Sequence, residues 1–219
     1  MTDTVVIVGA GPGLGGALAR RFAAGGWAVG VLARREETVS TCLRDLDEQG
    51  VPTRGVVADV VDPGALDRAL DELTAALGAP RTVIYNASLF QPEPALELTP
   101  EQLKLALDVH VVGALNTAKS AVRVMQPAGR GVLVFTVNRL AREPTAGATA
   151  LSIGKGAQLN LALSLELELE GTGLSVGIVT ICGPIAAGTD FDPDRIADRY
   201  WQVANQDPSS FRRDWAFDG

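Results

Sequence analysis

The segment that follows the first apolar run of the chain is rich in glycine. The stretch Gly9-Ala10-Gly11-Pro12-Gly13-Leu14-Gly15-Gly16 lies between Val5 to Val8, which predicts a buried strand, and Leu14 to Ala24, which predicts a helix. Glycine lets the backbone turn tightly and approach a pyrophosphate, and a helix N-terminus offers free N–H groups and partial positive charge. A turn without a ligand is the alternative, but the strand–turn–helix context favours phosphate binding. The predicted phosphate-binding residues are Gly9, Gly11, Gly13, Leu14 and Gly15.

Two consecutive arginines, Arg34 and Arg35, close the second apolar run. An acidic residue there would accept the ribose hydroxyls of NAD, whereas a guanidinium suits the 2′-phosphate of NADP through charge-assisted, often bidentate hydrogen bonds. The alternative is a solvated basic start of a helix, but a helix N-terminus disfavours basic residues. The pair therefore favours NADP(H) over NAD(H).

One lysine, Lys155, stands near the start of a later predicted helix, in the stretch Ala150-Leu151-Ser152-Ile153-Gly154-Lys155-Gly156. It is either an ordinary surface lysine or a ligand-binding one. The helix dipole disfavours a cation in this position, so a binding role is the better explanation. Leu151, four residues earlier, can neither give nor take a proton.

The spacing Gly9-x-x-x-Gly13-x-Gly15 resembles the glycine motif of the short-chain dehydrogenase/reductase family. Val57-Ala58-Asp59-Val60 is similar to that family's adenine-contacting segment, and Tyr85-Asn86-Ala87-Ser88 to its N-N-A-G motif, with two of four positions changed. The resemblance covers the whole chain. It implies further cofactor contacts, including the nicotinamide ribose for the lysine, at Asp59, Val60, Asn86, Ala87, Ser88 and Lys155.

The resemblance also implies a catalytic set, most of which is changed here. In the family a Tyr exchanges the proton, a Lys four residues later lowers the tyrosine pKa, a Ser about thirteen residues before the Tyr polarises the carbonyl, and an Asn on the preceding long helix positions a relay water. In the same order, these positions fall on Leu151, Lys155, Asn138 and His110. A shift of one helical turn does not restore the acid, because no Tyr lies between Tyr85 and Tyr200.

Each changed position also has a purely structural alternative. Asn138 is either a loop residue or a hydrogen-bond donor to a substrate carbonyl, as in an oxyanion hole. His110, the only histidine, is either structural or a proton shuttle, because its unperturbed pKa lies near 6.5. Ser152 adjoins the lost position but would point about 100° round the helix from it. The predicted catalytic candidates are therefore Lys155, Asn138 and His110.

Alternating strands and helices must position these residues. Further strands are predicted at Trp27 to Ala33, Thr53 to Val57, Thr82 to Tyr85, Val132 to Val137, Leu174 to Ile181 and Trp215 to Phe217. Further helices are predicted at Glu36 to Gln49, Asp62 to Gly78, Thr99 to Met125, Ser152 to Glu170 and Asp192 to Asn205. This order favours an α/β fold, a Rossmann-type doubly wound parallel sheet of about seven strands with helices on both faces, as a single domain over residues 1–219.

Composition narrows the classes of partner. The chain has 219 residues, 47% of them hydrophobic, and a formal net charge of -7, which argues against nucleic acid and against an anionic membrane surface. Two distant cysteines and one histidine argue against a zinc site. The N-terminus lacks the features of a signal peptide, and no run approaches the roughly 18 apolar residues of a membrane span, so we expect a cytoplasmic protein.

These observations favour an NADP(H)-binding oxidoreductase with a small-molecule substrate and a non-standard proton source. Loss of the Tyr argues against ordinary ketone reduction. Substrates that need no such acid remain possible, for example one in which an iminium carbon or a conjugated C=C bond is reduced. The alternatives are a catalytically silent NADP(H)-binding sensor or partner subunit, and a non-redox enzyme that uses the cofactor as a scaffold. The helices ending at Met125 and Glu170 are apolar on more than one face, and in the resembled family they pack against a second subunit. We therefore expect a homodimer or homotetramer.

Overall fold

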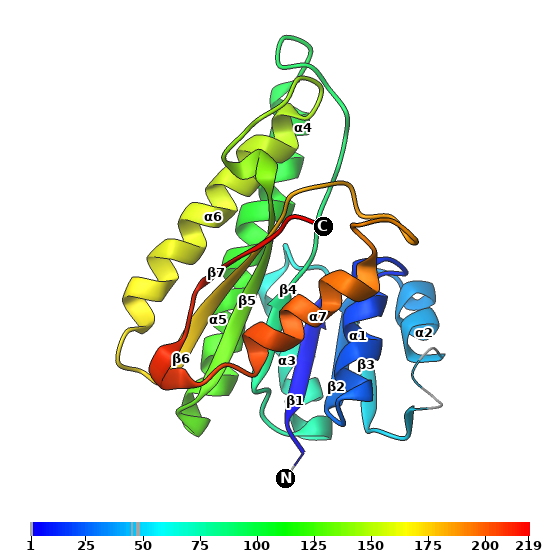
Figure 1. The fold of residues 1–219 in the computed structure, drawn as a ribbon, viewed down its shortest axis with the longest axis vertical. Coiled ribbons are helices and arrows are strands. Elements are labelled where there is room, and N and C mark those ends of the chain that lie inside the picture. The colour runs from blue at the N-terminus through cyan, green and yellow to red at the C-terminus, as the bar shows by residue number, and fades with distance from the viewer. Residues whose placement is uncertain (1, 45, 47–48) are drawn as a thin grey trace.

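The computed structural model describes residues 2–44, 46 and 49–219, which form a single seven-stranded parallel sheet with helices on both faces (Figure 1). The strand order is β3-β2-β1-β4-β5-β6-β7. The strands are β1 (Thr4–Val8), β2 (Ala28–Ala33), β3 (Thr53–Val57), β4 (Thr82–Tyr85), β5 (Gly131–Asn138), β6 (Leu174–Ile181) and β7 (Asp214–Phe217). The predicted doubly wound sheet is confirmed, and the order reverses between β1 and β4.

Two hydrophobic cores lie on opposite faces of the sheet. Successive residues of a strand point to opposite faces, so in β1 Val5 and Ile7 join one core while Val6 and Val8 join the other. The first core is covered by α1 (Leu14–Ala24), α2 (Glu36–Arg44) and α7 (Pro193–Ala204). The second is covered by α3 (Pro63–Leu77), α5 (Gly113–Met125) and α6 (Thr149–Leu169). Burial on both faces explains why the strands read as nearly continuous apolar runs.

The predicted helix starts carry the expected caps. The Asp62 side chain accepts a hydrogen bond from the Ala65 amide at the start of α3. Thr99 and Gln102 form a complete capping box at the start of α4 (Pro100–Leu107). Helix α6 begins at Thr149, somewhat before the predicted Ser152. The predicted helix from Glu36 is described only to Arg44, and residues 45, 47 and 48 of that prediction lie outside the described residues.

The predicted helix to Met125 is present, but it is not α-helical throughout. A π-helical turn, Asp108–Val112, separates α4 from α5. Such a turn holds one residue more than an α-helical turn. Within it, the Val109 carbonyl accepts a hydrogen bond from the buried Tyr85 hydroxyl. The turn therefore places His110, the only histidine, between α6 and the loop after β4.

Nowhere in the described ranges is there a helix long and apolar enough to cross a membrane.

Candidate functional site

The glycine loop connects β1 to α1 at the carboxyl end of the sheet. Gly9 has a φ of 87°, and a Cβ there would collide with the backbone of Ala87. The Gly9 and Ala10 amides both donate to the Leu32 carbonyl, at 2.9 and 3.0 Å, which fixes the loop against the end of β2. At Gly11 and Gly13 a Cβ would meet nothing within 4 Å, so the bare backbone faces open space. The loop can therefore take a ligand against its main chain.

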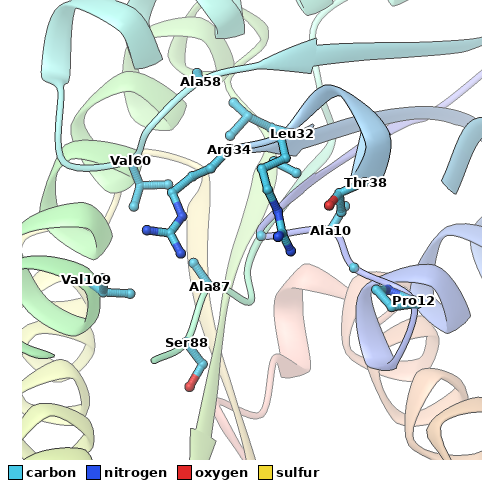
Figure 2. Close-up of a pocket in the computed structure, with 14 residues that line it drawn as sticks. Ala10, Pro12, Leu32, Arg34, Thr38, Ala58, Val60, Ala87, Ser88 and Val109 are labelled. Carbon is cyan, nitrogen blue, oxygen red and sulfur yellow. The ribbon is translucent and has the colours of Figure 1, made fainter. Parts of the chain in front are cut away.

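A pocket of about 210 Å³ opens beside this loop, and we call it the glycine-loop pocket. Arg34 reaches over it between Leu32 and Val60, and the side chains around it point toward one space (Figure 2). Of the residues predicted to bind a cofactor, those lining it are Gly9, Gly11, Arg34, Arg35, Val60, Ala87 and Ser88. Thr38 and Val109 also line it. Neither was identified in the sequence, because the predictive motifs consist of glycines, charges and the polar residues beside them.

Other predicted cofactor residues shape the backbone around the pocket. Asp59 accepts a hydrogen bond from the Val61 amide at 3.0 Å. Asn86 donates from Nδ2 to the Gly9 carbonyl at 3.0 Å and accepts at Oδ1 from the Thr136 hydroxyl at 3.1 Å. The remaining members of the predicted set, at the start of α1 and behind the glycine loop, are Gly13, Leu14 and Gly15. These residues lie beside the pocket lining and hold its shape.

Lys155 is not a surface residue, since its side chain is only 2% exposed. Its Nζ donates to the Thr136 carbonyl at 2.8 Å and to Gln158 Oε1 at 2.9 Å. Burial lowers the pKa of Lys155 to about 7, because an ammonium is poorly solvated inside the protein. The lysine thus stands behind the pockets, bound to acceptors of the protein itself.

His110 is fully buried beside Lys155. Its Nε2 lies 2.9 Å from the Leu89 carbonyl, which can only accept, so Nε2 carries the proton. Burial and the nearby Lys155 charge lower the pKa of His110 to about 4, against the opposing effect of the Leu89 hydrogen bond. Its Nδ1 has no hydrogen-bond partner within the described part of the chain. His110 is therefore neutral near pH 7.

A second pocket, of about 480 Å³, lies where β5 and β6 end and α6 begins. We call it the apolar pocket because most of its wall is hydrocarbon, including Leu151, Ile181 and Phe90. Asn138 lies on this wall, and its buried Oδ1 has no partner among the described residues. Leu151, 8% exposed, occupies the wall one helical turn before Lys155. Of the predicted catalytic residues, only Asn138 lines this pocket.

Cys182 and the two tyrosines are weak acids, and neither tyrosine lines the apolar pocket. Cys182 lines it, but burial raises the pKa of the thiol to about 11. The Tyr85 hydroxyl donates to the Val109 carbonyl and the Tyr200 hydroxyl to Thr136 Oγ1, so both are engaged within the core. Burial raises the pKa of both phenols. The buried Tyr200 side chain points toward β5 of the sheet.

Comparison with known proteins identifies the family. A family model described as short chain dehydrogenase matches residues 3–199. Sulfoacetaldehyde reductase 2 of Chromohalobacter salexigens is 30% identical over 193 residues, which are 87% of this chain and 75% of that reductase.

Solved structures agree on the fold. A metagenomic short-chain oxidoreductase in complex with NADP superposes with a TM-score of 0.88 at 23% identity, over 98% of this chain and 96% of that one. An NAD+-bound xylitol dehydrogenase superposes with a TM-score of 0.87 at 20% identity, over 98% and 96%. With the glycine loop, the sheet order and the matched family model together, this chain belongs to the short-chain dehydrogenase family of oxidoreductases.

Proposed function

We propose that the protein binds NADP(H) in the glycine-loop pocket and reduces a small organic substrate held in the apolar pocket, without a tyrosine acid. The observation that carries this proposal is Leu151, which forms the pocket wall at the position four residues before Lys155. The bond that is reduced must therefore accept a hydride without a proton from that position.

The glycine-loop pocket has the chemistry that a dinucleotide requires. Bare glycine backbone and the N-terminus of α1 suit a pyrophosphate, while Val60 and Val109 offer an apolar slot for adenine. Solved relatives include both an NADP complex and an NAD+ complex, so the fold alone does not select the cofactor. Arg34 and Arg35 favour the 2′-phosphate, because the described residues that line this pocket include two guanidiniums and no carboxylate. The cofactor, when bound, supplies the hydride.

The apolar pocket is poorly equipped to reduce a ketone. A positioned general acid contributes roughly 10²–10⁴-fold, and leucine contributes none of it. The Asn138 amide can donate a hydrogen bond but no transferable proton, and the His110 ring is engaged with Leu89. An alkoxide that receives no proton is costly beside the apolar wall of this pocket.

Two kinds of substrate avoid this cost. An iminium carbon takes the hydride while its nitrogen takes the π electron pair, so the product is a neutral amine and no proton is needed. A conjugated C=C bond takes the hydride at its β-carbon, which leaves an enolate whose charge is delocalised over carbon and oxygen. This anion is less basic on oxygen than an alkoxide, so it can persist until solvent water protonates it. The proposal therefore assigns a C=N or an activated C=C bond as the reducible group.

One observation favours a second candidate, a catalytically silent NADP(H)-binding sensor or partner subunit. The Lys155 ammonium is held by the Thr136 carbonyl and Gln158, and it lines neither pocket. A lysine held in this way is not free to bind a nicotinamide ribose unless it changes rotamer.

Calorimetric titration with NADPH and NADH, followed by an assay of NADPH oxidation, separates these candidates. The assay compares a cyclic iminium, an enone and a ketone of matched size. Turnover of the iminium or the enone without the ketone supports the oxidoreductase. Tight NADPH binding without turnover of any of the three supports the silent protein, and absence of binding to either nucleotide rejects both.

A further inference from the structure

Thr136, in the middle of β5, joins elements from both faces of the sheet. Its hydroxyl accepts a hydrogen bond from Tyr200 of α7 at 2.8 Å and donates to Asn86 Oδ1 at 3.1 Å. Its backbone carbonyl accepts from Lys155 Nζ at 2.8 Å. Asn86 in turn donates to the Gly9 carbonyl at 3.0 Å. A chain of hydrogen bonds thus runs from α7 through the sheet to the glycine loop.

The direction of every bond in this chain is fixed. The Gly9 carbonyl can only accept, so the Asn86 amide nitrogen must face it and the amide oxygen must face Thr136. The Thr136 hydroxyl therefore donates to Asn86, which leaves its lone pairs for Tyr200. Burial raises the pKa of Tyr200, so the phenol remains a donor at all ordinary pH values. The chain has one arrangement of protons and no alternative.

The hydrogen-bond chain ends at Gly9, where the glycine loop is tightly packed. Gly9 approaches the backbone of Ala87 so closely that a Cβ would not fit. The carbonyl of the same residue is the acceptor of the Asn86 bond. Moving the Asn86 side chain therefore moves the first residue of the glycine loop or leaves a partly buried polar group without its partner in the protein.

We propose that Tyr200 and Thr136 are positioning residues that fix the glycine loop for the cofactor by way of Asn86. This inference rests on the proposed cofactor site. The two residues touch no ligand, and their contribution is to restrict the Asn86 amide to the orientation that holds Gly9. Thr136 also fixes Lys155 through its carbonyl, which makes it the shared support of two parts of the site.

Four variants test the proposal: Tyr200→Phe, Thr136→Val, Thr136→Ser and, as matched control, Thr82→Val. Thr82 is also buried in a strand, but its hydroxyl has no partner among the described residues. The measurements are the NADPH dissociation constant and hydrogen–deuterium exchange of residues 9–16 in the cofactor-free protein, both well below the melting temperature of each variant. Loss of one such bond should raise the dissociation constant about 3- to 10-fold.

We expect Tyr200→Phe and Thr136→Val to weaken NADPH binding and speed exchange in the loop, while Thr136→Ser and Thr82→Val leave both unchanged. Adding Tyr200→Phe to Thr136→Val should cause no further loss, because the chain is already broken. If the unmodified protein binds no NADPH, the proposed function fails and exchange alone decides the inference. Unchanged exchange in either broken variant, or equal acceleration in the serine variant or the control, overturns it.

Discussion

We expect the choice of cofactor to depend on Arg34 and Arg35, which line the glycine-loop pocket. Replacing both with Gln should weaken NADP(H) binding at least about tenfold, because charge-assisted hydrogen bonds to the 2′-phosphate are worth about 1.5–3 kcal/mol each. NAD(H), which lacks that phosphate, should be little affected. Calorimetry with both nucleotides measures the difference, and Arg68→Gln, an exposed arginine on α3, controls for the loss of one positive charge elsewhere on the surface. Equal affinity of the unmodified protein for both nucleotides would contradict this assignment.

We expect Leu151 to decide which substrates are excluded. We expect the unmodified protein to leave simple ketones unreduced, and we expect Leu151→Tyr combined with Asn138→Ser to create measurable NADPH-dependent ketone reduction if the apolar pocket still accommodates a carbonyl. The variant with Asn138→Ser alone is the control, because it restores a hydroxyl but no acid. Ketone turnover by the unmodified protein at about 1–10³ s⁻¹ would show that another group acts as the acid.

His110 makes stability depend on pH in a defined window. Its pKa is about 4 in the folded protein and 6.5 when unperturbed, so the unfolded chain binds the proton first as the pH falls. The resulting loss of stability begins near pH 6.5 and is complete near pH 4. Replacing His110 with Asn should remove this part of the pH dependence. Urea unfolding of the unmodified protein and the Asn variant from pH 4 to 8 measures this difference. If the free energy of unfolding falls equally steeply with pH in both proteins below pH 6.5, His110 is not its cause.

At the scale of elements, α6 meets the π-helical turn through a glycine. A Cβ at Gly154 would lie 2.8 Å from His110 Cδ2, whereas one at Gly156 would lie 3.4 Å from its nearest neighbour, the Ala141 carbonyl oxygen. Alanine at Gly154 should therefore cost about 1–3 kcal/mol through overpacking, although alanine normally favours a helix. The Gly156→Ala variant is the control on the same helix and should be close to neutral.

Thermal or urea unfolding of these two variants measures how much stability each alanine costs. If His110 causes the clash, combining Gly154→Ala with His110→Ala should recover part of the loss, since the smaller side chain leaves room. Equal effects of the two alanines would mean that the close approach at Gly154 has no energetic consequence.

The strands and most helix ends could be predicted because local signals specify them. Apolar runs, the Asp62 and Thr99 caps and the terminating glycines act over a few residues. The π-helical turn could not be predicted, because the reason for it lies in Tyr85, a residue distant in sequence that supplies a partner for the Val109 carbonyl. The apolar periodicity of the helix sequence does not depend on the hydrogen bond from Tyr85 to Val109, so it could not reveal the π-helical turn.

The candidate site divides in the same way. Gly9, Gly11 and the two arginines were predictable from type and spacing, and they line one pocket. The other predicted residues of the loop lie beside that pocket. The engagement of Lys155 with Thr136 and the burial of Tyr200 were not, since both depend on which side chains meet across the sheet. These contacts depend on how strands and helices that are far apart in the chain pack against each other.

At the scale of the whole molecule, apolar side chains remain exposed along two helical segments. Leu105, Val112 and Leu115 lie along α4, the π-helical turn and α5, and Ile153 and Leu167 lie on α6. Clusters of this kind are typical of surfaces that pack against another subunit. We expect at least a dimer at micromolar concentration, and we expect Leu115→Asp combined with Leu167→Asp to shift it toward monomer.

Light scattering of the unmodified protein and the double Asp variant at matched concentrations measures the change in oligomeric state. Val57→Asp is the control, because Val57 is another exposed apolar residue but lies at the end of β3, the opposite edge strand of the sheet from β7. A monomeric unmodified protein would contradict the expectation, as would an equal effect of the control.

The hydrogen-bond chain from Tyr200 to Gly9 has a consequence for the order in which the protein is made. Its members, Gly9, Asn86, Thr136 and Tyr200, are spread across nearly the whole chain. During synthesis, the glycine loop emerges from the ribosome first, but its last support emerges with α7. A nascent chain in which α7 has not yet emerged can pair β1 with β2 and bond Gly9 to the Leu32 carbonyl, but it lacks the Tyr200 end of the hydrogen-bond chain. We therefore expect the nucleotide site to be completed only after α7 has packed on the sheet, so that a ribosome stalled before residue 200 carries a sheet without that support.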